Sequence, residues 1–202
     1  MSLDRVVLWR HGETDYNTAL RMQGQSDESL LTEVGVGQAQ RAAPVLAALR
    51  PDVLVTSDLS RAAITARVLG EHLGLEPDVD KRLRETHLGK WQGLTQAEVD
   101  AGWPGDRAVW RDTPDWSPPG GETRLEVAAR AGQVVDELDA AGHRRAVLCT
   151  HGGLISGLTP LLLGLRPPAW PLFPGISNCH WTVLRRVRGR WRLESYNTAA
   201  PV

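Results

Sequence analysis

Residues 5–14 read Arg5-Val6-Val7-Leu8-Trp9-Arg10-His11-Gly12-Glu13-Thr14, an apolar run that leads directly into a cation and a histidine. A short apolar run of this kind is typical of a buried strand. Arg10 and His11 would then lie at the C-terminal tip of that strand, the edge at which open α/β sheets bind ligands. Arginine matches phosphate with a planar fork of donors, and histidine offers a nitrogen nucleophile or base. The stretch therefore indicates phosphate chemistry on histidine.

The composition fits one domain over residues 1–202 that can bury a sizeable core. A net charge of -1 argues against a nucleic-acid or membrane-surface partner, because both require a basic patch. No stretch approaches the roughly 20 apolar residues of a membrane helix, and none resembles a signal peptide. Cys149 and Cys179 are the only cysteines and do not suggest a disulfide framework or a zinc site. We therefore expect a reduced, cytoplasmic protein.

Strand and helix patterns alternate after the opening strand, which favours a mainly parallel sheet. Strands are predicted at 52–57 and 145–150, and a final hairpin at 179–187 and 190–196. Helices are predicted at 32–49, 57–73, 120–141 and 154–163, with Val34 on the core side of the first and Ser57-Asp58 capping the second. Residues 83–85 would end a short extended piece. Residues 94–119, interrupted by Gly and Pro, should form a small cap-like insertion over the sheet edge.

Three predicted strands end in polar groups: Arg10-His11, Ser57 with Arg61 one helical turn later, and His151. If these strands are parallel neighbours, their polar ends converge in one pocket. Two histidines and two arginines around one spot make a site for a dianion. Zinc would require cysteine or carboxylate ligands at coordination spacing, which this set does not offer.

Five ordered blocks of sequence resemble the histidine phosphatase (phosphoglycerate-mutase-like) superfamily, and the resemblance covers Val6 to about Asn197. The blocks are Arg10-His11-Gly12-Glu13-Thr14, Ser57-Asp58-Leu59-Ser60-Arg61-Ala62, Leu83-Arg84-Glu85 with Gly89 and Gly93, Gly120-Gly121-Glu122-Thr123, and Thr150-His151-Gly152-Gly153. The resemblance implies a three-layer α/β/α sandwich. It also implies a metal-independent phosphatase that needs no cofactor and acts on a small phosphate ester.

The resemblance further implies a role for each matching residue. His11 would be the nucleophile that carries a phosphohistidine. The phosphoryl oxygens would be held by Arg10, Asn17, Arg61 and His151. Glu85 would protonate the leaving alcohol and then activate water. Two alternatives stay open at this point, because Arg84 could pair with Glu85 and Glu122 is a rival acid.

A closer similarity within the family is to phosphatases of glucosyl-3-phosphoglycerate. It rests on residues 15–17, 21–25, 82–89 and 91–95. Substrate-binding residues would then be Arg21, Gln23, Gly24 and His87. Broad-specificity and α-ribazole phosphatases share much of this pattern. Phosphoglycerate mutases resemble the chain less, because they place an arginine where it has Thr86. A catalytically inactive binding domain on the same fold is a rival from another class.

Two features have both a structural and a functional interpretation. The tryptophans of the cap region could pack the cap or stack on a sugar, and packing is the commoner role; they are Trp103, Trp110 and Trp116. Residues 170–176 and the last strands offer apolar surface on which a homodimer could form.

Overall fold

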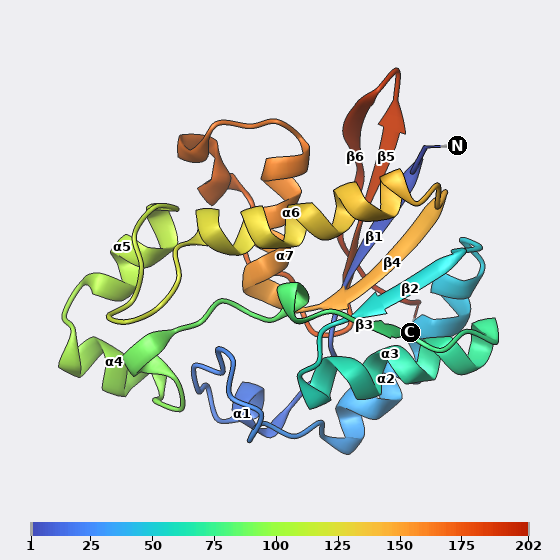
Figure 1. Ribbon diagram of the computed structural model, residues 1–202. Coiled ribbons are helices and arrows are strands. Elements are labelled where there is room, and N and C mark those ends of the chain that lie inside the picture. Colours follow the sequence, from blue (N-terminus) through green and yellow to red (C-terminus); the bar gives the residue numbers. More distant parts are fainter. Residues whose placement is uncertain (1, 202) are drawn as a thin grey trace.

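A computed structural model describes residues 2–201 of the chain. Its sheet has six strands in the order β3-β2-β4-β1-β5-β6. The strands are β1 (Arg5–Arg10), β2 (Val53–Thr56), β3 (Asp78–Val79), β4 (Arg145–Thr150), β5 (Trp181–Val187) and β6 (Arg190–Thr198). Helices cover both faces, so the predicted three-layer α/β/α sandwich is confirmed (Figure 1).

The centre of the sheet is parallel and one side is an antiparallel hairpin. β1 and β2 each run parallel to β4, and β3 runs parallel to β2. Arg10 of β1 lies opposite Thr150 of β4. β5 runs antiparallel to β1 and continues into β6. The predicted mainly parallel sheet and terminal hairpin are both present. β1 and β4 therefore end side by side, and each delivers its last residues to the same edge.

Helices α2 (Glu33–Ala47) and α3 (Ser60–Leu73) cover one face of the sheet. Helices α6 (Arg124–Ala140) and α7 (Gly152–Leu162) cover the other. Each pair packs against its own hydrophobic cluster, which includes alternate residues of β1: Val7 and Trp9 on the first face, Val6 and Leu8 on the second. None of the helices in residues 2–201 is long and apolar enough to span a membrane.

Three local predictions were wrong. Val34 does not face the core but is 55% exposed, because Gly35 and Ala39 occupy the buried side of α2. The N-cap of α3 is Leu59, and the Ser57 hydroxyl instead accepts a hydrogen bond from the Leu59 amide at 3.3 Å. Leu83 ends a 3-10 turn, η1 (Lys81–Leu83), rather than an extended piece.

The remaining elements are short. They are α1 (Asp15–Thr18), η2 (Gly89–Trp91), α4 (Gln96–Gly102), α5 (Asp106–Asp112) and η3 (Pro167–Leu172). Segment 94–119 holds α4 and α5, and Figure 1 shows α5 beside the start of α6. Trp91 is fully buried beneath this segment, with ring centroids 5.7–6.3 Å from Trp103, Trp110 and Trp116. The three tryptophans therefore pack the segment against η2.

Candidate active site

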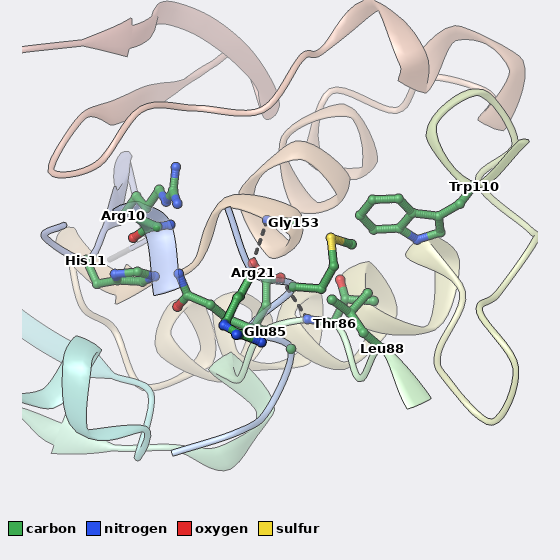
Figure 2. A pocket seen from close by; sticks show the side chains of 12 residues that line it. Arg10, His11, Arg21, Glu85, Thr86, Leu88, Trp110 and Gly153 are labelled. Atoms are coloured by element: carbon green, nitrogen blue, oxygen red, sulfur yellow. Dashed lines mark hydrogen bonds between the residues drawn. The ribbon is translucent and has the colours of Figure 1, made fainter. Parts of the chain in front are cut away.

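The ends of β1 and β4 bring two histidines together. The His11 amide donates to the Thr150 carbonyl at 2.9 Å, which extends the β1–β4 ladder by one step. The rings of His11 and His151 lie with their centroids 5.1 Å apart at an angle of 61°. A pocket opens in front of His11, and its walls are formed by Arg10, His11, Asn17, Arg21, Met22, Gln23, Gly24, Glu85, Thr86, Leu88, Trp110 and Gly153. Figure 2 shows it as elongated, with Arg10 and His11 at one end and Trp110 at the other.

The tautomer of His11 is set by the backbone. Its Nδ1 lies 2.7 Å from the Gly12 carbonyl, which can only accept a hydrogen bond, so Nδ1 carries the proton. Burial, followed by the charges of Arg61 and Arg10, lowers the pKa of His11 well below its ordinary value, and the Gly12 bond opposes this only partly. The ring is therefore neutral near pH 7, and its Nε2 carries a free lone pair. A neutral imidazole in this state can act as a nucleophile.

His151 is the N-cap residue of α7 and is fully buried. Neither of its ring nitrogens has a hydrogen-bond partner in the described residues. Burial lowers the pKa of His151 well below its ordinary value, and Arg61 and His11 add to that effect. Buried polar atoms normally have partners, so two unpartnered nitrogens facing a histidine and arginines indicate a place that a ligand completes.

Arg10 and Arg61 supply two positive charges that no carboxylate of residues 2–201 pairs with. Arg10 donates from Nη1 to the Ile176 carbonyl at 2.6 Å. Arg61 is fully buried and donates to the carbonyls of Ser26 and Gly24 at 2.7 and 2.8 Å. Burial lowers the pKa of both groups, to about 10 for Arg61. Both remain cationic near pH 7, and the N-terminus of α7 adds a favourable dipole for an anion between them.

The Glu85 carboxylate is held at the N-terminus of α7 by three backbone amides. It accepts from Thr86 at 2.7 Å, Gly153 at 2.9 Å and Leu154 at 3.0 Å. Gly153 is required for this approach, because a Cβ there would lie 2.5 Å from Glu85 Oε1. Figure 2 shows Glu85 in the middle of the pocket, beyond Arg10 and His11. The carboxylate is thus fixed where it can exchange a proton with a ligand bound beside His11.

The ion pairs bear on both alternatives that the sequence left open. Arg84 pairs with Asp58 through two bonds of 2.6 and 2.7 Å, and not with Glu85. Glu122 accepts two bonds of 3.0 Å from Arg130. Although burial raises the pKa of Glu122, Arg130 and the His87 amide together hold it below its usual value. Glu122 is thus committed to structural contacts, whereas Glu85 faces the pocket.

Several other predicted residues line the pocket. Asn17 accepts at Oδ1 from Thr14 and from Asn178 at 3.0–3.1 Å, which leaves its amide NH2 available. Gln23 donates to the Thr14 hydroxyl, and its Oε1 is buried with no partner in the described residues. Asn178 was missed by the sequence analysis, because nothing in its surroundings along the chain marks it.

Arg21, Gly24 and His87 have different environments. Arg21 is an exposed residue on the pocket rim, and its Nη1 donates to the Gly93 carbonyl at 2.6 Å. Gly24 has a φ of 52°, and a Cβ there would lie 2.4 Å from Gln92 Oε1. His87 is not among the residues that line this pocket; its Nδ1 accepts from the Gly89 amide at 3.2 Å.

The apolar half of the pocket was not predicted. Met22, Leu88 and Trp110 form it, with Thr86 and Gly153 beside Glu85. The sequence left open whether Trp110 packs the cap or stacks on a sugar. In the structure its ring packs on Trp91, and the residue also lines the pocket. Within residues 2–201 no group of three or more His, Cys, Asp and Glu side chains could hold a metal ion.

The comparisons with known proteins agree with this geometry. Residues 6–199 match the histidine phosphatase superfamily (branch 1). A glucosyl-3-phosphoglycerate phosphatase of Mycolicibacterium vanbaalenii is 47% identical, with 100% of this chain and 98% of the relative covered. The structure of a mycobacterial glucosyl-3-phosphoglycerate phosphatase with VO3 has a TM-score of 0.94 at 49% identity, covering 97% of this chain and 100% of that one. A probable phosphoglycerate mutase of Cronobacter sakazakii is 38% identical over 80% of this chain and 75% of its own length. The chain therefore belongs to branch 1 of the histidine phosphatase superfamily and is a phosphatase.

Proposed function

We propose that this phosphatase hydrolyses glucosyl-3-phosphoglycerate, or a sugar phosphate close to it, through a phosphohistidine on His11 and without a metal ion. The observation that carries the mechanism is a neutral His11 with a free Nε2, next to two arginines without carboxylate partners. Such a site has a nucleophile and a receptacle for a dianion, and Glu85 adds a fixed proton donor within the same pocket.

In the first step Nε2 of His11 attacks phosphorus, and the bond from phosphorus to the ester oxygen breaks. Glu85 gives its proton to that oxygen, so the alcohol leaves neutral. In the second step Glu85 takes a proton from water, whose oxygen attacks phosphorus while the bond to Nε2 breaks. One carboxyl group serves both steps, because the first step leaves it ionised.

The phosphoryl oxygens need donors that are already in place when charge develops in the transition state. Arg10 and Arg61 supply two guanidinium groups, and the unpartnered His151 and the free amide of Asn17 add neutral donors. The amide end of α7 faces the same spot. Each of these groups is held by a backbone carbonyl, a cap position or a neighbouring side chain, so little reorganisation is needed when the substrate binds.

The substrate assignment rests on the relatives, which are named for glucosyl-3-phosphoglycerate and align over the whole chain. The pocket is consistent with it, since its inner end is polar and its outer end carries Met22, Leu88 and Trp110. We propose that Arg21, Gln23 and Gly24 contact the leaving group. Segment 94–119 would be the cap that sets specificity through Trp110, which can stack on a sugar ring.

A hydrolase is favoured over a mutase because of Thr86. Mutases of the family place an arginine directly after the acidic residue, whereas Thr86 is 3% exposed and carries no charge. A second phosphate-bearing alcohol would therefore be held weakly, and water would accept the phosphoryl group instead. Broad-specificity and α-ribazole phosphatases stay as the alternative substrates to be screened.

The experiment is a phosphate-release screen with glucosyl-3-phosphoglycerate, α-ribazole phosphate, 3-phosphoglycerate and simple sugar phosphates. We expect the highest kcat/KM for glucosyl-3-phosphoglycerate, and no turnover of any ester by His11→Ala. His143→Ala, a histidine near the surface, is the matched control and should keep normal activity. Full activity of His11→Ala would refute the mechanism. Binding of esters by the wild type without phosphate release would instead favour the inactive binding domain.

Two further expectations stay predictions. A cytoplasmic location fits the two cysteines, which are both buried and free. A homodimer has less apolar surface available than the sequence suggested, since Trp170 and Ile176 are each 2% exposed, although Leu172 (78% exposed) and Pro174 face outward.

A further inference from the structure

Arg124 is a buried arginine outside all the family blocks. It is 9% exposed, and of the described arginines only Arg61 is buried more deeply. It forms no ion pair with a carboxylate of residues 2–201. Its hydrogen bonds are two long ones, from Nη2 to the carbonyls of Trp110 at 3.4 Å and Arg111 at 3.3 Å. A guanidinium removed from water without a counterion is unfavourable unless something else supplies the charge.

The position of Arg124 relates it to the pocket. It is the first residue of α6, and its side chain crosses α7 at Gly157, where a Cβ would lie 2.9 Å from Arg124 Cγ. Gly157 lies one turn beyond Gly153, so both glycines are on the same face of α7. Gly153 makes room for the Glu85 carboxylate and Gly157 makes room for Arg124. The two side chains therefore cross the same face of α7 one turn apart.

The backbone partner of Arg124 points to the outer end of the pocket. Trp110, whose carbonyl accepts from Arg124, also lines the pocket. Figure 2 shows Trp110 at the end opposite Arg10 and His11, with Glu85 between them. Arg124 is not itself among the residues that line the pocket. Its bond to the Trp110 carbonyl places its guanidinium next to the backbone at this outer end, towards which a leaving group would extend after passing Glu85.

The electrostatics of Arg124 resemble those of the phosphate end. Burial lowers the pKa of Arg124, and the charge of Glu85 is the largest opposing effect. The same two influences come first for Arg10 and Arg61. Glu85 is therefore within electrostatic reach of all three cations, and only Arg10 and Arg61 have a ligand group assigned to them.

We propose that Arg124 binds a carboxylate of the leaving group, so that the preferred substrates are phosphate esters of alcohols that also carry an acid. This rests on the proposed function, in which the ester oxygen lies beside Glu85. In a 3-phosphoglycerate unit the carboxylate is two carbons from the carbon that bears the ester oxygen. With phosphate at Arg10 and Arg61, that carboxylate would extend past Glu85 towards the Trp110 end of the pocket, next to which Arg124 lies. It would replace two long bonds to carbonyls with charge-assisted ones.

Arg21 is the other cation in reach of the pocket. It is exposed on the rim and already has a short bond of 2.6 Å to the Gly93 carbonyl. A hydrated surface cation gains little from an additional partner, whereas a buried unpaired one gains more. Arg124 is therefore the better candidate for carboxylate recognition.

The test compares two esters that differ only at the group in question. 3-Phosphoglycerate has a carboxylate where glycerol 3-phosphate has a hydroxymethyl group. We expect Arg124→Gln to lower kcat/KM for 3-phosphoglycerate about 10- to 100-fold, mainly through KM, as for loss of a charge-assisted bond. In the same variant, kcat/KM for glycerol 3-phosphate should change by less than about threefold, because this ester has no carboxylate. Arg111→Gln, an exposed arginine of α5, is the matched control and should change neither.

An equal loss on both esters would mean that Arg124 only holds α5, and would overturn the proposal. The proposal would also be overturned if Arg21→Gln, but not Arg124→Gln, lost the preference for 3-phosphoglycerate over glycerol 3-phosphate. If Arg124→Gln does not fold, glycerate and glycerol are compared as product inhibitors of the wild type; equal inhibition refutes the subsite, and at least tenfold stronger inhibition by glycerate supports it. A selective effect of Arg124→Gln together with poor hydrolysis of glucosyl-3-phosphoglycerate would retain the subsite and reject the proposed substrate.

Discussion

The contact between Gly153 and Glu85 makes the position of the proposed proton donor, Glu85, testable without altering its side chain. In Gly153→Ala the new methyl group would lie 2.5 Å from Glu85 Oε1 and 2.9 Å from Thr86 Oγ1. The backbone of α7 cannot yield, because it is packed on the sheet through Leu154 and Ile155. The Glu85 carboxylate must therefore move, and it would lose one or both of its bonds to the amides of α7.

The size of the effect follows from the displacement. An ordinary contact requires the oxygen to retreat by about 0.5–0.9 Å, and misplacement of a catalytic group by roughly 1 Å can cost about 100-fold in rate. General acid catalysis as a whole contributes about 10²–10⁴-fold. We therefore expect Gly153→Ala to lower kcat 10- to 100-fold on an alkyl ester, or about 1.4–2.7 kcal/mol of transition-state stabilisation. Glu85→Gln should set the lower limit of activity.

The assay uses two leaving groups, glycerol 3-phosphate and 4-nitrophenyl phosphate. The nitrophenolate leaves without much protonation, so Gly153→Ala and Glu85→Gln should affect it far less. Gly152→Ala is the neighbouring control, because its Cβ would meet Arg10 only at 3.4–3.6 Å. Equal losses on the two esters, or wild-type rates on both, would refute the placement of Glu85 as proton donor.

Two further predictions concern stability. Burial keeps His11 and His151 neutral in the folded protein. In the unfolded chain both histidines take up a proton near pH 6.5. Acid therefore stabilises the unfolded state, and the free energy of unfolding falls as the pH drops below about 6.5. Urea denaturation should show that the free energy of unfolding is lower at pH 5 than at pH 7.5 by up to about 2 kcal/mol per histidine. In His151→Asn this difference between the two pH values should be about half as large. An unchanged difference in that variant would contradict the explanation. Trp91→Ala should lower the free energy of unfolding by about 3–5 kcal/mol and speed proteolysis within segment 94–119. A decrease below about 1 kcal/mol would show that the tryptophan cluster does not hold this segment in place.

The inner end of the site could be predicted from the sequence because strand topology determines it. Apolar runs ending in Arg10-His11 and in Thr150-His151 are short enough to be strands, and parallel strands place their C-terminal ends at one edge. The register then leaves no freedom, since Arg10 lies opposite Thr150 and the next residues are the two histidines. Periodicity likewise predicted the helices on both faces, although it misplaced Val34 where small residues face the core.

Contacts made by side chains across the fold could not be predicted, because each involves a choice between partners of equal chemistry. Arg84 could pair with Glu85 or Asp58, and only the position of α3 decides for Asp58. Asn178 contacts Asn17 from 161 residues away in the sequence. The apolar pocket wall combines residues from three distant segments, and no periodic pattern within any one of them marks the set.

Arg124 illustrates the same limit and what the structure adds to it. In sequence it is one arginine among many at the start of a helix, where a cation is unfavourable beside the helix dipole and no ion pair could be inferred. In the fold it is buried on the same face of α7 as Glu85. A cation that is unfavourable for its own helix, and that the fold leaves without a counterion, has no evident structural advantage over a neutral residue. Its burial next to a phosphatase pocket is explained if the counterion arrives with the substrate.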